Sequence, residues 1–106
     1  EESDMLVVNP THFAVALYYR PGQTPLPKLV AKGTDANARK LIDRAKAADV
    51  PVIQCVWLAR TLYEAKLGAG IPRETLHAVA LIYRTLRDLD DEAKRETLEL
   101  PELEQR

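Results

Sequence analysis

Two apolar runs, residues 5–8 and 13–19, are separated by only four residues. Two extended segments with so short a link pair side by side, so the pattern predicts two antiparallel strands joined by a turn. The second run is apolar without alternation, which is typical of a strand buried on both faces. We therefore expect an interior strand of a sheet, with the turn at the end of that sheet.

The segment 28–55 has the pattern of a strand, a helix and a strand. Residues 28–32, closed by Gly33, and residues 50–55 are the expected strands. Between them, one apolar helix face is indicated by residues spaced three and four apart, namely Ala38, Leu41, Ile42 and Ala45. Thr34 or Asp35 is expected to cap this helix. Strands connected in this way run parallel, so the predicted sheet is mixed.

Two more helices are expected downstream. One covers residues 57–66 and ends before the glycines at 68 and 70, and Pro72 suits the first position of the other. The inner face of that last helix is expected to carry Val79, Ile82, Tyr83 and Leu86. The predicted fold is one small α/β domain over residues 1–87, with a mixed central sheet of about four strands and helices packed around it.

Charge is distributed unevenly along the 106 residues. Residues 1–87 hold 12 basic and 8 acidic side chains, whereas residues 88–106 hold 3 and 8. An acidic end with few aromatic residues is typical of a solvated segment, so we expect 88–106 to be a flexible tail.

Cys55 excludes an internal disulfide because it is the only cysteine of the sequence. Its apolar neighbours predict a buried structural thiol rather than a nucleophile.

The basic residues of 28–46 do not indicate a nucleic-acid binding site. They are not interleaved with aromatic side chains, so a solvated helix face is the first interpretation and a weak contact with anionic lipid headgroups is the alternative. With two histidines and no acidic cluster around them, the chain offers no convincing set of metal ligands. His77 is expected to lie at the surface or to have its hydrogen bonds satisfied within the fold. We expect no cofactor.

The turn between the two apolar runs carries the chemistry. It reads Asn9-Pro10-Thr11-His12. Pro10 has no N–H, so it cannot attack the Asn9 side chain, which is the usual route of asparagine ageing. The reverse attack remains: the Asn9 side-chain nitrogen adds to the Asn9 main-chain carbonyl, closes a succinimide and expels Pro10. His12 is the nearest candidate base or turn organiser, and Thr11 supports the turn.

Magnitudes decide whether such a turn reacts. A half-time of about an hour needs a barrier of roughly 22 kcal/mol. An aligned base supplies about 3–5 kcal/mol and a strained turn ~1–3 kcal/mol, so intramolecular alignment must provide much of the rest. The alternative is an inert turn, because Asn-Pro commonly opens turns without reacting.

The NPTH motif and its flanks resemble a known family. Asn-Pro-Thr-His-Phe-Ala-Val-Ala-Leu at 9–17 is similar to the signature of the substrate-specificity switch subunit of the flagellar and type III secretion export apparatus. Further landmarks in the same order are Thr-Pro-Leu-Pro at 24–27, Val-Ala-Lys-Gly at 30–33, Val-Pro-Val-Ile at 50–53 and Leu-Ala-Arg-Thr-Leu-Tyr at 58–63. The chain departs from the usual pattern at Gln54-Cys55-Val56-Trp57, so the resemblance does not define a partner surface there.

This resemblance implies a function for the turn. The expected protein is the cytoplasmic domain of an inner-membrane export protein whose N-terminal transmembrane part is missing here. It self-cleaves between Asn9 and Pro10, keeps its own cleaved N-terminal fragment, and controls which substrates are exported. Other apparatus components and secreted proteins are the expected partners, without nucleic acid. The loop at 20–27 favours a virulence injectisome over a flagellum. Each molecule would cut itself once, so the reaction is not enzymatic turnover. The alternative function is a non-cleaving interaction domain.

Overall fold

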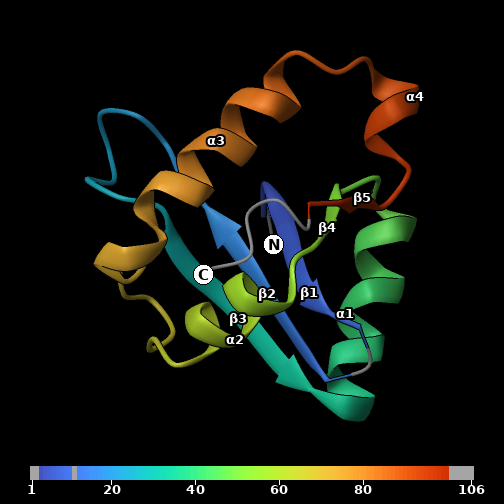
Figure 1. Ribbon diagram of the computed structural model, residues 1–106, viewed down its shortest axis with the longest axis horizontal. Helices are drawn as coiled ribbons and strands as arrows, with labels where there is room; N and C mark the ends of the chain where they lie inside the picture. Colours follow the sequence, from blue (N-terminus) through green and yellow to red (C-terminus); the bar gives the residue numbers. More distant parts are fainter. Residues whose placement is uncertain (1–2, 11, 101–106) are drawn as a thin grey trace.

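The structure, a computed structural model that describes residues 3–10 and 12–100, has a five-stranded mixed sheet with helices on both faces (Figure 1). The strands are β1 (Met5–Asn9), β2 (Phe13–Tyr18), β3 (Lys28–Thr34), β4 (Val52–Gln54) and β5 (Leu98–Glu99). The helices are α1 (Asp35–Ala47), α2 (Val56–Tyr63), the 3₁₀ turn η1 (Arg73–Thr75), α3 (Leu76–Arg87) and α4 (Asp91–Lys94).

The strand order is β3-β2-β1-β4-β5, so β1 lies at the centre of the sheet. β1 pairs antiparallel with β2 and parallel with β4, and β2 pairs antiparallel with β3. β3 and β4 therefore run in the same direction, as their pattern predicts, although two strands lie between them. The interior position predicted for β2 is confirmed, because all four residues from Ala14 to Leu17 are buried.

Each face of the sheet has its own core, because successive side chains of a strand point to opposite faces. On one face, Leu6 and Val8 pack with α1, and the apolar helix face predicted from spacing is confirmed there. On the other face, Met5 and Val7 pack against α2 and α3. Within the part of the chain that the structure describes, none of these helices has the length and hydropathy required to cross a bilayer.

The structure has one strand more than the sequence predicts. β5 lies in the segment expected to be a flexible acidic tail, and there it pairs parallel with β4 through Leu98 opposite Ile53. A two-residue strand among charged residues has no periodicity from which it could be predicted. The flexibility of 88–106 stays a prediction, and residues 101–106 lie outside the described residues.

Several element boundaries also differ from the predicted ones. β3 continues to Thr34, because Gly33 does not close the strand but lies buried against α1. A Cβ added at Gly33 would stand 2.9 Å from Cβ of Asn37, so glycine allows this close approach. β4 is three residues long, within the predicted 50–55, and α2 ends at Tyr63 rather than residue 66.

Candidate functional site

The turn between β1 and β2 lies at one end of the sheet, at the bottom of Figure 1. Asn9 is the last residue of β1 and pairs with Phe13, the first residue of β2. The backbone N–H of His12 donates a hydrogen bond of 2.9 Å to the main-chain oxygen of Asn9. That oxygen belongs to the Asn9-Pro10 peptide bond, so a fixed donor already points at the carbonyl that would be attacked.

A second hydrogen bond anchors the turn to α1. The backbone N–H of Asp35 donates to the main-chain oxygen of His12 at 3.1 Å. Asp35 has φ +49°, in the left-handed region that aspartate tolerates better than most residues. The backbone of His12 is thus held on both sides, by Asn9 through its N–H and by α1 through its carbonyl.

The strands on either side of the turn are braced as well. Beside β1, the Cys55 backbone N–H donates to the Val8 oxygen at 3.1 Å, one residue before Asn9. Beside β2, the ring of Phe13 contacts the ring of Tyr63 at 5.0 Å between centroids. Tyr63 is the last residue of α2, and the Lys32 ammonium lies 4.6 Å from the centre of its ring. The turn therefore connects two strand ends that are fixed by hydrogen bonding and ring packing.

Three of the four predicted site residues are described, and they come together in this turn. Asn9 and Pro10 are half-buried and His12 is exposed, whereas Thr11 lies outside the described residues. Attack on the Asn9 carbonyl would place negative charge on its oxygen, and the sequence alone identifies no donor that could stabilise this charge. The structure supplies the backbone N–H of His12, at a distance suited to stabilise negative charge on the Asn9 oxygen. The four-residue link contained this signal, since its first carbonyl and fourth N–H commonly bond.

The other singled-out side chains lie away from this chemistry. Cys55 is buried in the core, as predicted, and His77 is exposed on α3. Lys32 does not belong to a basic surface, because its ammonium donates to the main-chain oxygens of Tyr63 and Ala65, each at 2.9 Å. One carbonyl belongs to the last residue of α2 and the other lies two residues beyond it, at a helix C-terminus where a positive charge is favoured.

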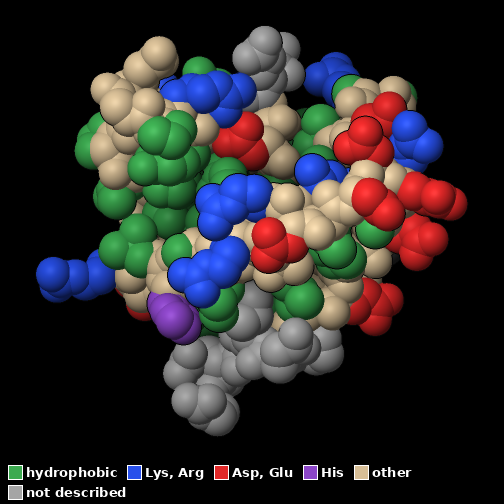
Figure 2. Space-filling view, turned by 90° about the horizontal axis from the view of Figure 1, so that it is seen from above, with side chains coloured by type: hydrophobic (Ala, Val, Ile, Leu, Met, Phe, Trp, Pro, Cys, Tyr) green, Lys and Arg blue, Asp and Glu red, His purple; other side chains and the backbone are tan. Residues whose placement is uncertain are grey.

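A pocket of about 820 Å³ lies at the end of the sheet opposite the turn. Its lining includes residues of the loop at 20–27, called the proline-rich loop below, and of α3. Among them are Leu26, Pro27, Tyr83 and Arg84. Figure 2 views the molecule from the top of Figure 1 and shows basic side chains beside hydrophobic ones, with acidic side chains gathered at one side. This loop is thus one wall of a concave site.

Comparison with curated proteins connects this geometry to a family. A family model described as FlhB HrpN YscU SpaS Family matches residues 1–86. The chain is 38% identical over 101 residues to the flagellar biosynthetic protein FlhB of Helicobacter pylori, covering 94% of this chain and 28% of that protein. It is 37% identical over 98 residues to the secretion system apparatus protein SsaU of Salmonella typhimurium, covering 92% of this chain and 28% of SsaU. The chain therefore spans little more than a quarter of these relatives.

Solved structures share the fold. The cytoplasmic domain of FlhB from Shewanella putrefaciens is 31% identical, with a TM-score of 0.85 over 93% of this chain and 82% of that one. An Asn-to-Ala variant of the EscU C-terminal domain is 42% identical, with a TM-score of 0.77 over 83% of this chain and 89% of that one. By sequence and by fold, the chain belongs to the FlhB, HrpN, YscU and SpaS family, in the region solved as the cytoplasmic or C-terminal domain of its members.

Proposed function

We propose that this chain is the autocleaving switch domain of a type III export apparatus, and that it cuts its own Asn9-Pro10 bond. The observation that carries the proposal is the 2.9 Å hydrogen bond from the His12 N–H to the Asn9 carbonyl oxygen. It polarises the bond to be cut and stands ready for the charge that develops on attack. Preorganised donors of this kind supply a large part of catalysis in acyl transfer.

The reaction needs no outside reactant until its last step. The Asn9 side-chain nitrogen attacks the Asn9 carbonyl carbon, and the carbonyl electrons move onto the oxygen that the His12 N–H holds. The proton lost by the attacking nitrogen passes to a base, for which the exposed His12 imidazole is the candidate. The oxyanion then collapses, the C–N bond to Pro10 breaks, and the Pro10 nitrogen takes up a proton. Water afterwards opens the succinimide at Asn9.

Family members support this assignment. Solved structures of the EscU C-terminal domain include variants in which an Asn is changed to Ala or Asp and variants in which the Pro that directly follows is changed to Ala. A pair of consecutive Asn and Pro residues is thus a point of interest in EscU. In this chain the corresponding chemistry is open to Asn9 and Pro10.

In the cell, the proposed role is control of export specificity. The domain sits at the cytoplasmic face of the bacterial inner membrane, below a transmembrane part, and contacts other apparatus components and secreted substrates. Its own cleaved N-terminal fragment remains a partner within the sheet. The cut happens once per molecule, so the domain is a switch rather than an enzyme with turnover. The proline-rich loop favours a virulence injectisome.

Intact mass spectrometry under denaturing conditions tests the cut. Two masses separated between Asn9 and Pro10 are expected for the purified chain, and one full-length mass for Asn9→Ala. Asn37→Ala, at an exposed position of α1, is the matched control and should cleave like the parent. Two fragments from Asn9→Ala, or an uncut parent after long incubation, would contradict the proposal.

The rival function is a non-cleaving interaction domain that acts through its surface. The 820 Å³ pocket beside the proline-rich loop is the specific observation in its favour. The same mass measurement separates the two functions, because a non-cleaving domain should give a single full-length mass.

A further inference from the structure

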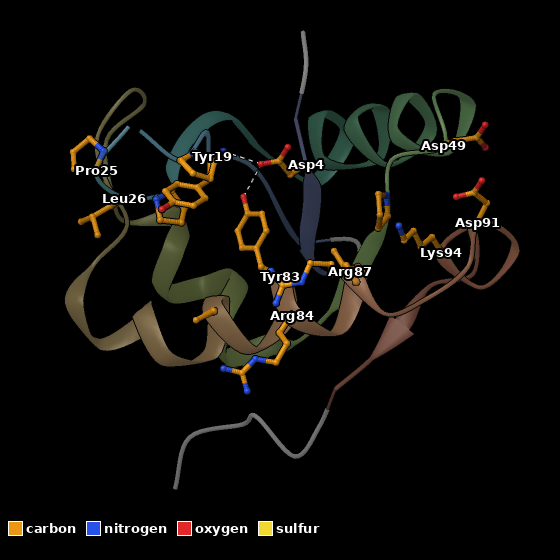
Figure 3. A pocket seen from close by; sticks show the side chains of 15 residues that line it. Asp4, Tyr19, Pro25, Leu26, Asp49, Tyr83, Arg84, Arg87, Asp91 and Lys94 are labelled. Carbon is orange, nitrogen blue, oxygen red and sulfur yellow. Dashed lines mark hydrogen bonds between the residues drawn. The ribbon is translucent and has the colours of Figure 1, made fainter. Parts of the chain in front are cut away.

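Asp4 connects the segment before β1 to the rest of the domain. Its carboxylate accepts a hydrogen bond from the Tyr19 backbone N–H at 2.7 Å, one from the Tyr83 hydroxyl at 2.8 Å and one from the Arg20 guanidinium at 2.9 Å. Figure 3 shows Asp4 beside Tyr19 and Tyr83, with dashed lines for its hydrogen bonds to both. Asp4 lies before the Asn9-Pro10 bond, and all three donors lie after it.

The three donors are themselves held in place. The rings of Tyr19 and Tyr83 meet edge to face at 5.9 Å between centroids. The Arg20 guanidinium lies 4.2 Å from the centre of the Tyr18 ring and also donates to the Tyr19 carbonyl at 2.8 Å. The side chain of Asp4 is only 21% exposed, so it is largely withdrawn from competing water. A charged acceptor with fixed donors forms stronger hydrogen bonds than a neutral one.

A cut at Asn9 makes the Asp4 contacts more important for holding β1 in the sheet. Before the cut, β1 is tied covalently to β2 at its Asn9 end. After the cut, only noncovalent contacts hold β1, namely its pairing with β2 and β4 and the four buried side chains from Met5 to Val8. Such a strand frays from its free end at Asn9, and Asp4 pins the opposite end. The strand leaves only when the Asp4 contacts also break.

We propose that Asp4 is the clamp that retains the N-terminal fragment in the sheet after cleavage, through Tyr19, Arg20 and Tyr83. The clamp joins the two products of the cut at the end of the sheet farthest from the cut. This inference rests on the proposed function, because only a cut chain has a fragment to retain. Asp4 is thus a positioning residue for the cleaved state and takes no part in bond breaking.

Exchange of the fragment measures the clamp. Cut protein is mixed with an excess of fluorescently labelled synthetic peptide of residues 1–9, and the rise in anisotropy follows its replacement of the bound fragment. Asp4→Asn and Asp4→Ala should exchange about 10- to 100-fold faster, since they weaken hydrogen bonds to a charged group. Tyr83→Phe removes one donor and should have a smaller effect in the same direction. It also provides a test that leaves Asp4 itself in place.

The matched control is Asp49→Asn, which removes the charge of a side chain that is 64% exposed and pairs with Arg95. It should exchange at the parent rate. Salt supplies a second readout, because the Asp4 and Arg20 charges are screened by ions. The parent should exchange faster as salt is raised, and Asp4→Asn should respond less. Equal rates for Asp4→Asn, Asp4→Ala and Asp49→Asn, with unchanged circular dichroism, would overturn the proposal.

A second set of proteins separates the clamp from self-cleavage. These carry Asn9→Ala and a protease recognition sequence inserted after Pro10, and they are cut only after folding. The Asp4 variants in this set should show the same acceleration. An uncut parent would then contradict the self-cleavage proposal alone, while the protease-cut set still decides whether Asp4 is the clamp.

Discussion

Pro10 decides which of two reactions is open to Asn9. Its missing N–H blocks attack on the Asn9 side chain, and its nitrogen is the leaving group of the cut. Pro10→Ala restores that N–H, so we expect slower cleavage and the appearance of deamidated, full-length chain. Mass spectrometry over a time course measures both products. Pro21→Ala, in the exposed part of the loop, is the control, and cleavage of Pro10→Ala at the parent rate without deamidation would contradict this account.

Tyr83 gives the domain a measurable response to alkaline pH. Burial first, and then the hydrogen bond to Asp4, raise the pKa of Tyr83 above the ordinary tyrosine value of about 10. The folded state then keeps a proton that the unfolded state loses. This contribution to stability is therefore complete below about pH 10 and is lost as pH rises beyond it.

Urea unfolding between about pH 9 and 11 tests that sign. The free energy of unfolding of the parent should fall faster with rising pH than that of Tyr83→Phe. A steeper fall in Tyr83→Phe would show that the sign is wrong.

At the scale of the elements, Lys32 joins β3 to the end of α2. Lys32→Met keeps the length of the apolar stem but removes the two hydrogen bonds to the Tyr63 and Ala65 carbonyls. We expect a loss of about 1–3 kcal/mol in the free energy of unfolding, measured by urea denaturation. Lys40→Met, at an exposed position of α1, should change it little. Equal stability of the two variants would mean that these carbonyls are served equally well by water.

The sequence predicts the elements that have a pattern. Continuous apolar runs identify β1 and β2, and spacings of three and four identify the inner faces of α1 and α3. It does not predict β5, whose two residues are too few for any period. Nor does it predict the partners of Lys32, because they depend on how β3 and α2 meet in three dimensions.

The candidate site divides in the same way. Asn9, Pro10 and His12 are identifiable from their chemistry and spacing alone. The anchoring of His12 by Asp35 is not, because it depends on where α1 begins relative to the turn. Asp4 was likewise missed, since its donors come from positions 15 to 79 residues away.

For the whole molecule, the cut turns a one-chain folding reaction into an association. Unfolding of the cut domain releases two molecules, so its apparent stability depends on concentration. Tenfold dilution should lower the free energy of unfolding by about 1.4 kcal/mol in the cut parent. In uncut Asn9→Ala it should have no effect. Urea titrations at two protein concentrations check this, and concentration-independent unfolding of the cut parent would show that its fragments do not separate on unfolding.

The central position of β1 has a consequence for the emptied domain. β1 pairs on one side with β2 and on the other with β4. Its departure would open a slot between two strands and leave two rows of backbone N–H and C=O groups facing each other without partners. Unpaired sheet edges recruit other extended chains and promote aggregation. A domain that had lost its first strand would therefore accept a foreign strand in the same place.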